Sequence, residues 1–142
     1  MPDTGNTNPD KAIIDNIIKM FFDFFSNTDS KHPDVAILKD ICIPQILIIK
    51  KTGLQEIVYD MPSFLQPRIK ILTDGTLKDF EECETYEETK IIGNIAQRFS
   101  TYQKSGNLHG AYFKEYGNKF FQFIKTNNGW KINALTWEND II

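Results

Sequence analysis

Four residues in the second half of the chain have side chains suited to chemistry at spacings that bring them together. Glu82 and Glu84 lie two residues apart in a strand-like segment, so both carboxylates project from one face of that strand. Paired carboxylates suit general acid and base chemistry. Arg98 and Tyr102 share one face of the next strand-like segment. A guanidinium group at the wall of an apolar cavity favours a ligand that carries a carboxylate.

The pairing of these two segments decides which of the four residues face the interior. A tight turn near residues 89–90 places Arg98 and Tyr102 beside Glu81, with the glutamate pair on the opposite face. A bulge of one residue exchanges the two faces. Two plainer interpretations stay open: Arg98 forms a surface ion pair with Glu81, and the glutamate pair belongs to a solvated acidic edge.

The other reactive residue types show no catalytic or metal-binding spacing. His32 precedes a proline, and His109 lies in an expected loop. Cys42 and Cys83 are far apart and fit no zinc or redox motif, which indicates two free thiols. The sequence contains no glycine-rich phosphate loop, no H-E-x-x-H motif and no G-x-S-x-G motif. We therefore expect neither a metal nor a cofactor.

Composition and charge argue against several classes of function. The 142 residues predict a single domain spanning residues 1–142, in which residues 1–8 are expected to be flexible. A net charge of −3 without a basic stripe argues against binding to nucleic acid. No apolar run reaches the roughly 20 residues of a membrane span, and the first residues lack the pattern of a signal peptide. We therefore expect a cytoplasmic protein without a membrane partner.

Periodicity and turn residues predict the elements that position these side chains. The pattern predicts a long, mostly apolar helix that begins after Asn8 and ends near residue 26. It predicts a second long helix with Ser63 and Asp60 as candidate caps and Pro67 near its first turn. The second helix spans residues 61–73. A short helix is expected over residues 33–40, and strands over residues 45–51, 54–60, 77–88, 91–103, 118–125 and 129–137, with a long connection at 104–117. This order predicts an α+β fold in which a curved antiparallel sheet wraps around the helices.

The last two predicted strands carry apolar side chains on both faces. Asn127-Asn128-Gly129 is typical of a hairpin turn. Phe121 and Phe123 share the more apolar face, which we expect to face the core and the pocket. The opposite face combines aromatic anchors with polar groups, as protein interfaces do, and carries Phe120, Gln122, Ile124, Leu135 and Trp137. We therefore predict a homodimer through this sheet face; a tail or loop that covers the face is the alternative.

Several sequence segments resemble the nuclear transport factor 2-like (SnoaL-like) superfamily. They are DFEECE after the second long helix, GNIAQRFSTY, and GNKFFQF followed by NNGWKINALTW, which ends at Trp137. The resemblance covers nearly the whole chain from about residue 10 and is nearest to uncharacterised bacterial members. It implies a cone-shaped, cystatin-like α+β fold with a pocket between sheet and helices, in a protein that is usually a homodimer. Members of the superfamily include isomerases, dehydratases, cyclases, epoxide hydrolases and non-catalytic binding modules, so the fold does not choose the activity.

These observations lead to three hypotheses about function. The first is a homodimeric domain that binds a small apolar or carboxylate-bearing molecule in a pocket formed by Arg98, Tyr102, Glu82, Glu84, Phe121 and Phe123. The second is an enzyme of the isomerase, dehydratase or epoxide-hydrolase type, which requires a carboxylate or tyrosine deep in the cone. The third is a structural dimer whose cone is filled by its own side chains, since the chain has eleven phenylalanines.

Overall fold

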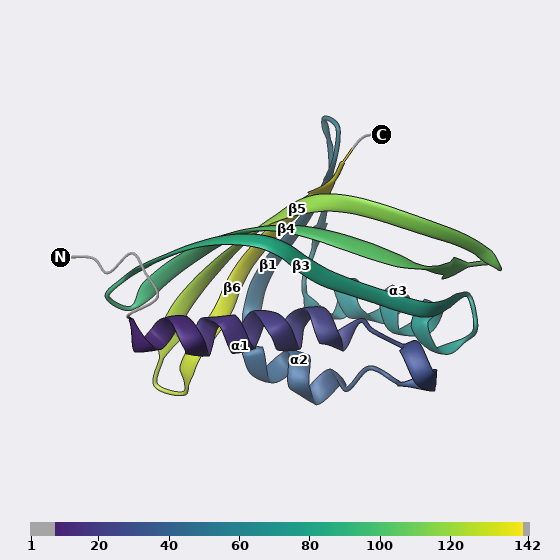
Figure 1. Cartoon of the computed structure of the whole chain (residues 1–142). Helices are drawn as coiled ribbons and strands as arrows, with labels where there is room; N and C mark the ends of the chain where they lie inside the picture. The colour runs from purple at the N-terminus through teal and green to yellow at the C-terminus, as the bar shows by residue number, and fades with distance from the viewer. Residues whose placement is uncertain (1–7, 141–142) are drawn as a thin grey trace.

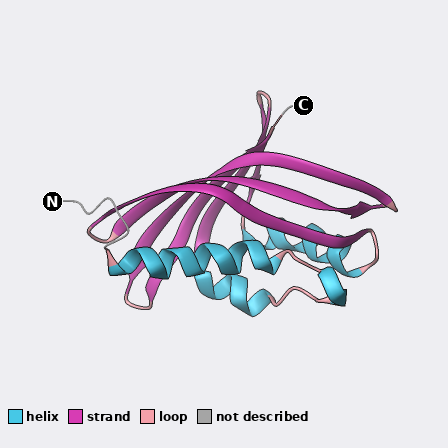
Figure 2. Ribbon diagram, in the orientation of Figure 1, coloured by secondary structure: helices cyan, strands magenta, loops and turns pink. Residues whose placement is uncertain are grey.

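The computed structural model describes residues 8–140, in which three α-helices lie against one side of a six-stranded curved sheet (Figures 1 and 2). The predicted flexibility of residues 1–7 lies outside the described residues. The elements in chain order are α1 (Pro9–Phe24), η1 (Thr28–Ser30), α2 (Val35–Ile41), β1 (Cys42–Thr52), β2 (Gln55–Tyr59), α3 (Met61–Thr73), β3 (Leu77–Ile92), β4 (Ile95–Leu108), β5 (Ala111–Thr126) and β6 (Gly129–Asn139). No helix in this part of the chain has the length and apolar character needed to cross a membrane.

The sheet confirms the predicted α+β fold. Its strand order is β2-β1-β6-β5-β4-β3. All neighbouring strands are antiparallel except β1 and β6, which run parallel, so the sheet is mixed rather than entirely antiparallel. The sheet curves around the helices without closing, and its two edges are β2 and β3 (Figure 1).

Both long helices begin with side-chain caps. The side chain of Asn8 accepts a hydrogen bond from the backbone N–H of Asp10 at 2.9 Å, as predicted for α1. In α3 the cap is Asp60, one of the two predicted candidates, and Ser63 is its partner in a capping box. The Asp60 carboxylate accepts from the Ser63 N–H at 2.9 Å, and the Ser63 hydroxyl accepts from the Asp60 N–H at 3.0 Å. The helix begins at Met61, as predicted, so Pro67 lies in its second turn rather than its first and removes one helical hydrogen bond.

The predicted long connection at residues 104–117 is wrong. These residues belong to β4 and β5, which are joined by the two-residue turn His109-Gly110. Both turn residues have positive φ angles, 51° for His109 and 83° for Gly110, as tight hairpins with the usual strand twist require. The resulting long arm extends over α3 (Figure 1).

An irregularity in β3 makes the predicted facing of the strands over residues 77–88 and 91–103 wrong. The turn between β3 and β4 follows Ile92 rather than residues 89–90, and the register shifts by one residue at Thr85. Because of this shift Glu84 pairs with Tyr102, so the glutamate pair turns to the concave face that Arg98 also occupies. The alternative with a one-residue bulge is therefore the one that the structure adopts.

A second irregularity in β6 corrects two predicted interface residues. The register between β5 and β6 shifts at Asn133, which has no partner in the ladder. The side chains that follow therefore point to the face opposite to the predicted one. Leu135 is 1% exposed and Trp137 is 6% exposed, both on the concave side. Neither side chain can form a sheet-face interface, because the chain's own helices cover them.

Asn27 fixes the end of α1 to the rest of the cone. Its side chain is buried, and its amide donates to the carbonyl oxygens of Leu72 at 2.9 Å and Leu77 at 2.7 Å. Its carbonyl oxygen accepts from the backbone N–H of Phe80 at 2.7 Å. One buried side chain therefore connects α1 with the end of α3 and the start of β3.

Candidate functional site

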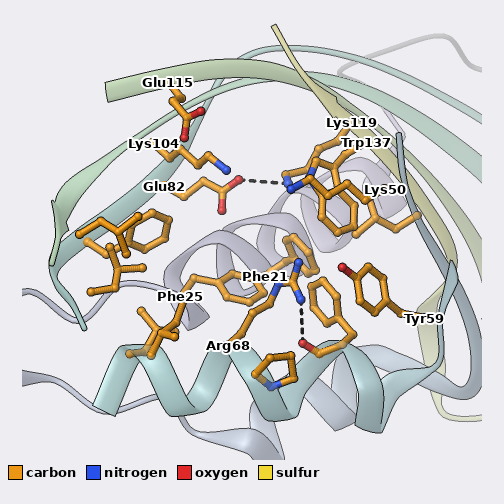
Figure 3. Close-up of a pocket in the computed structure, with 18 of the residues that line it drawn as sticks. Phe21, Phe25, Lys50, Tyr59, Arg68, Glu82, Lys104, Glu115, Lys119 and Trp137 are labelled. Atoms are coloured by element: carbon orange, nitrogen blue, oxygen red, sulfur yellow. Dashed lines mark hydrogen bonds and ion pairs between the residues drawn. The ribbon is translucent and has the colours of Figure 1, made fainter. Parts of the chain in front are cut away.

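A cavity of about 460 Å³ lies between α1, α3 and the concave face of the sheet (Figure 3). Aromatic side chains form much of its wall, including Phe21, Phe25, Phe64, Phe80, Phe113 and Trp137. A cavity of this size with mostly apolar walls is typical of sites for small organic molecules. Among residues 8–140, no cluster of histidine, cysteine, aspartate or glutamate side chains is arranged to hold a metal.

The charged groups of the cavity carry an excess of positive charge. Four cations line it, each from a different element: Lys50 from β1, Arg68 from α3, Lys104 from β4 and Lys119 from β5. Two carboxylates line it, those of Glu82 and Glu115. The cavity lining therefore has a formal charge of +2, which favours an anion.

Lys119 is the most enclosed of these cations. Its side chain is 6% exposed, and its Nζ lies 3.0 Å from Oε2 of Glu82, whose side chain is 8% exposed. The Nζ also lies 4.3 Å from the centre of the Tyr102 ring and 5.1 Å from that of Trp137. Burial lowers the pKa of Lys119, and the charges of neighbouring cations lower it further, whereas Glu82 opposes the change.

Arg68 is held by aromatic rings rather than by a carboxylate. Its guanidinium carbon lies 4.2 Å from the Phe64 ring centre, 5.1 Å from that of Tyr59 and 5.4 Å from that of Trp137. One nitrogen donates to the Phe64 carbonyl oxygen at 3.0 Å. Within residues 8–140 Arg68 forms no ion pair. Its position is therefore fixed while its charge is not matched by a neighbouring carboxylate.

Lys104 also lacks a direct carboxylate contact among the described residues. Burial lowers the pKa of Lys104, although Glu82 and Glu115 oppose this effect. Figure 3 shows Lys104 and Glu115 on the arm of the sheet, opposite Arg68 on the helix. Cations thus approach the cavity from both the sheet and the helix.

The predicted ligand anchor Arg98 lies in a separate buried network and does not line this cavity. Its side chain is 4% exposed. It donates twice to Glu84, at 3.0 and 2.5 Å, and once to Asp15 at 2.5 Å, and it lies 3.0 Å from a carboxylate oxygen of Glu87. Ser100 donates a further hydrogen bond to Glu84. Three carboxylates already surround Arg98, so its charge is satisfied within the protein.

Lys11 completes this network from α1. Its Nζ lies 2.8 Å from Asp15 and 3.2 Å from Glu87. Partial burial raises the pKa of the Asp15 carboxyl, but the hydrogen bonds and charges of Lys11 and Arg98 outweigh burial, so the pKa lies below its ordinary value. Together these contacts connect α1 to β3 and β4.

The remaining residues of the predicted pocket lie in different places. Glu82 is the only one of the six that lines the cavity. Glu84 belongs to the Arg98 network, while Phe121 and Phe123 are 0% and 1% exposed in the core. Tyr102 is also buried, and burial together with nearby carboxylates raises its pKa, so its hydroxyl stays protonated and donates to Asn139.

Tyr102 packs directly against a glycine of the neighbouring strand. Gly117 pairs with Tyr102 across β4 and β5. A Cβ atom at this glycine would lie 2.2 Å from the Tyr102 hydroxyl oxygen and 2.7 Å from the Glu138 carbonyl oxygen. The glycine in mid-strand therefore makes room for the ring on which Lys119 rests.

The sequence pattern indicates two of the four cations that line the cavity. Lys119 alternates with Phe121 and Phe123, so a face that holds these two residues also holds Lys119. Lys104 and Glu115 fall in the segment that was predicted as a loop, but His109-Gly110 between strand-like runs is a hairpin signal. No local pattern indicates Lys50 or Arg68, because their role depends on the packing of β1 and α3 against the arm.

The convex face carries the predicted interface residues that stay exposed. Phe120 is 56% exposed, Gln122 is exposed and Ile124 is partly exposed. The Phe120 ring lies 5.1 Å from Phe99, which lies 6.4 Å from Tyr86 on the next strand. Adjacent strands thus share a row of aromatic side chains on the side away from the helices.

A second cavity of about 580 Å³ lies between α2, β1 and α3 and has almost no charged lining. Cys42 lies in its wall, and burial raises the pKa of this thiol to about 12. A thiol with such a pKa stays protonated and unreactive near neutral pH. Cys83, in contrast, is exposed.

Known structures share this arrangement of helices and sheet. No family model matches the sequence, and no curated protein matches it either. A conserved protein from Planctomyces limnophilus is similar with a TM-score of 0.74 at 12% identity, over 94% of this chain and 98% of that chain. A nuclear transport factor 2-like superfamily protein from Salmonella enterica gives a TM-score of 0.71 at 15% identity, over 93% and 92% of the two chains. A nuclear transport factor 2-like protein from Cytophaga hutchinsonii gives 0.69 at 14% identity, over 94% and 100%. The chain therefore has the nuclear transport factor 2-like fold.

Proposed function

We propose that the protein binds a small organic molecule with an apolar body and a carboxylate group in the cavity of the cone. The observation that carries this proposal is the excess of cations over carboxylates in a cavity whose other walls are aromatic and aliphatic. Arg98, the anchor expected from the sequence, is replaced in this role by Arg68 and Lys104, which have no carboxylate partner in the described chain.

The physical argument rests on the cost of leaving these cations unpaired. A partly buried cation loses hydration, and a ligand carboxylate supplies charge-assisted hydrogen bonds in a site of low dielectric constant. The aromatic walls contribute apolar contacts to the body of the ligand. A neutral molecule of the same shape gains only the apolar contacts. We therefore expect the protein to bind a carboxylate more tightly than the corresponding amide.

Isothermal titration calorimetry with 4-methylbenzoate and 4-methylbenzamide tests this proposal. We expect the carboxylate to bind at least about tenfold more tightly, because one charge-assisted hydrogen bond contributes about 1.5–3 kcal/mol. Lys104→Met should remove most of this preference and leave amide binding unchanged. Lys90→Met, a substitution of an exposed strand lysine outside the cavity, is the matched control. Equal affinity for the two compounds, or no binding of either, would overturn the proposal.

We further propose that two copies of the chain associate through the convex sheet face. Support comes from the row formed by Tyr86, Phe99 and Phe120, which lies on adjacent strands and leaves Phe120 more than half exposed. A twofold axis through such a row brings identical aromatic side chains together. Sedimentation equilibrium should give a dimer for the native protein and a monomer for Phe120→Asp. Leu54→Asp, at a turn where the native residue is 96% exposed, should remain dimeric. A monomeric native protein would refute the assembly.

A further inference from the structure

Lys119 has the surroundings of a nucleophilic amine rather than those of a surface lysine. It projects from β5 into the cavity, as Figure 3 shows, and its side chain is almost completely enclosed. Its Nζ contacts the faces of aromatic rings on one side and a single carboxylate, Glu82, on the other. Filling the space does not by itself require an amine at this position, because an aliphatic side chain would also fill it; the charge of Lys119 is buried together with that of Glu82.

Two features of the site favour the neutral form of this amine. The Lys119 side chain is only 6% exposed, so burial penalises the ammonium ion, and further cations face the same cavity. Charged groups face the cavity from five elements: Lys50 from β1, Arg68 from α3, Glu82 from β3, Lys104 from β4 and Glu115 from β5. The cavity lining from α1 and β6 is apolar. Desolvation and neighbouring cations are the two means by which proteins activate a lysine for reaction with carbonyl compounds.

We propose that Lys119 forms an imine with the carbonyl carbon of an aldehyde or ketone that carries a carboxylate. This inference rests on the proposed function, since Arg68 and Lys104 hold the carboxylate while the carbonyl carbon meets Nζ. The ligand class is therefore narrowed from carboxylates in general to oxo acids and formyl acids with an apolar body. In this proposal the cavity binds its ligand covalently, through the amine of Lys119.

Glu82 is the proton acceptor and donor in this reaction. Its Oε2 lies 3.0 Å from Nζ, within hydrogen-bond distance, and takes a proton from the ammonium group. The free electron pair on nitrogen then attacks the carbonyl carbon, the C–N bond forms, and a second proton moves from the nitrogen to the carbonyl oxygen, which becomes a hydroxyl group. Glu82 returns its proton to this hydroxyl group, the C–O bond breaks, water leaves, and the product is the protonated imine. One water molecule is released for each imine formed, and no oxidant or reductant is consumed.

Reductive trapping tests the inference directly. The native protein is incubated with 4-carboxybenzaldehyde and sodium cyanoborohydride, which delivers hydride to the imine carbon and leaves a stable secondary amine. Peptide mapping by mass spectrometry then reports which lysines carry one carboxybenzyl group. We expect Lys119 to be labelled at least about tenfold faster than the exposed Lys90, with a rate that saturates with aldehyde concentration, because a lower pKa raises the fraction of neutral amine. Labelling of Lys119 at or below the rate of Lys90 would overturn the inference.

Variants and a competitor separate this inference from the proposed function. Lys119→Arg keeps a cation beside Glu82 but cannot form an imine, so specific labelling should disappear, whereas Lys90→Arg should retain it. The map of the native protein decides the question even if the buried arginine prevents folding. If 4-methylbenzoate binds while Lys119 stays unlabelled, the covalent step fails and the binding function stands. If Lys119 is labelled and 4-methylbenzoate neither binds nor competes, the imine formation at Lys119 is supported and the proposed carboxylate site is refuted. Absence of both refutes both.

Discussion

Removing the guanidinium group of Arg98 should strongly destabilise the fold. Arg98→Met keeps the volume and the aliphatic contacts but leaves three carboxylates, those of Asp15, Glu84 and Glu87, facing the single charge of Lys11. Glu84 has a side chain only 18% exposed and loses two hydrogen bonds. Breaking a buried pair from one side costs about 3–5 kcal/mol, a large part of the roughly 5–15 kcal/mol that stabilises a domain.

A second substitution should recover part of this loss. The native network has three carboxylates and two cations, a formal charge of −1, which becomes −2 in Arg98→Met. Arg98→Met combined with Glu84→Gln returns the charge to −1. We therefore expect the double variant to be more stable than Arg98→Met by at least about 1 kcal/mol, the order of a coupling between directly contacting residues. Urea unfolding followed by tryptophan fluorescence measures all three free energies.

The pH dependence gives an independent measure of the same interaction. The folded-state pKa of Asp15 lies below its ordinary value of 3.8, so its contribution to stability is complete at neutral pH and is lost as pH falls through the folded-state pKa. Arg98→Met removes one cause of this depression. The difference in unfolding free energy between the native protein and Arg98→Met should therefore be largest near neutral pH and narrow below about pH 4. A difference under about 1 kcal/mol at pH 7, or one that does not change with pH, would refute the reasoning.

Three further predictions follow from particular contacts. Gly117→Ala should lower the free energy of unfolding by about 1–3 kcal/mol or more in the same urea assay, because its Cβ would overlap Tyr102; a neutral effect would mean that the ring moves aside at no cost. In a thiol assay at pH 8 only Cys83 should react with Ellman's reagent before unfolding, since the pKa of Cys42 is about 12; rapid reaction of both thiols would contradict the buried position. Asn27→Ala should cost about 2–4 kcal/mol in thermal or urea unfolding, because three backbone groups lose their partner, and a loss below 1 kcal/mol would show that water replaces the amide.

Sequence patterns of a few residues were sufficient to predict most helices and strands of the fold. The start of α1, the bounds of α3 and the Asn127-Asn128 turn follow from caps, periodicity and turn residues, which act within one or two turns of chain. The order of these elements, together with the motifs that end at Trp137, indicated the α+β cone that the structure has.

Only the tertiary structure decided which residues line the cavity. A strand presents alternate residues to opposite faces, so the one-residue shifts at Thr85 and Asn133 reverse the side chains that follow, although neither shift has a clear local signal. These shifts bring the glutamate pair to the concave face and turn Trp137 into the cavity. The cationic lining depends on α3 and on three strands, β1, β4 and β5, whose cations meet only when the sheet curves around the helix. Local sequence energies therefore determine the elements, whereas register and curvature, which depend on packing across the whole sheet, determine the site.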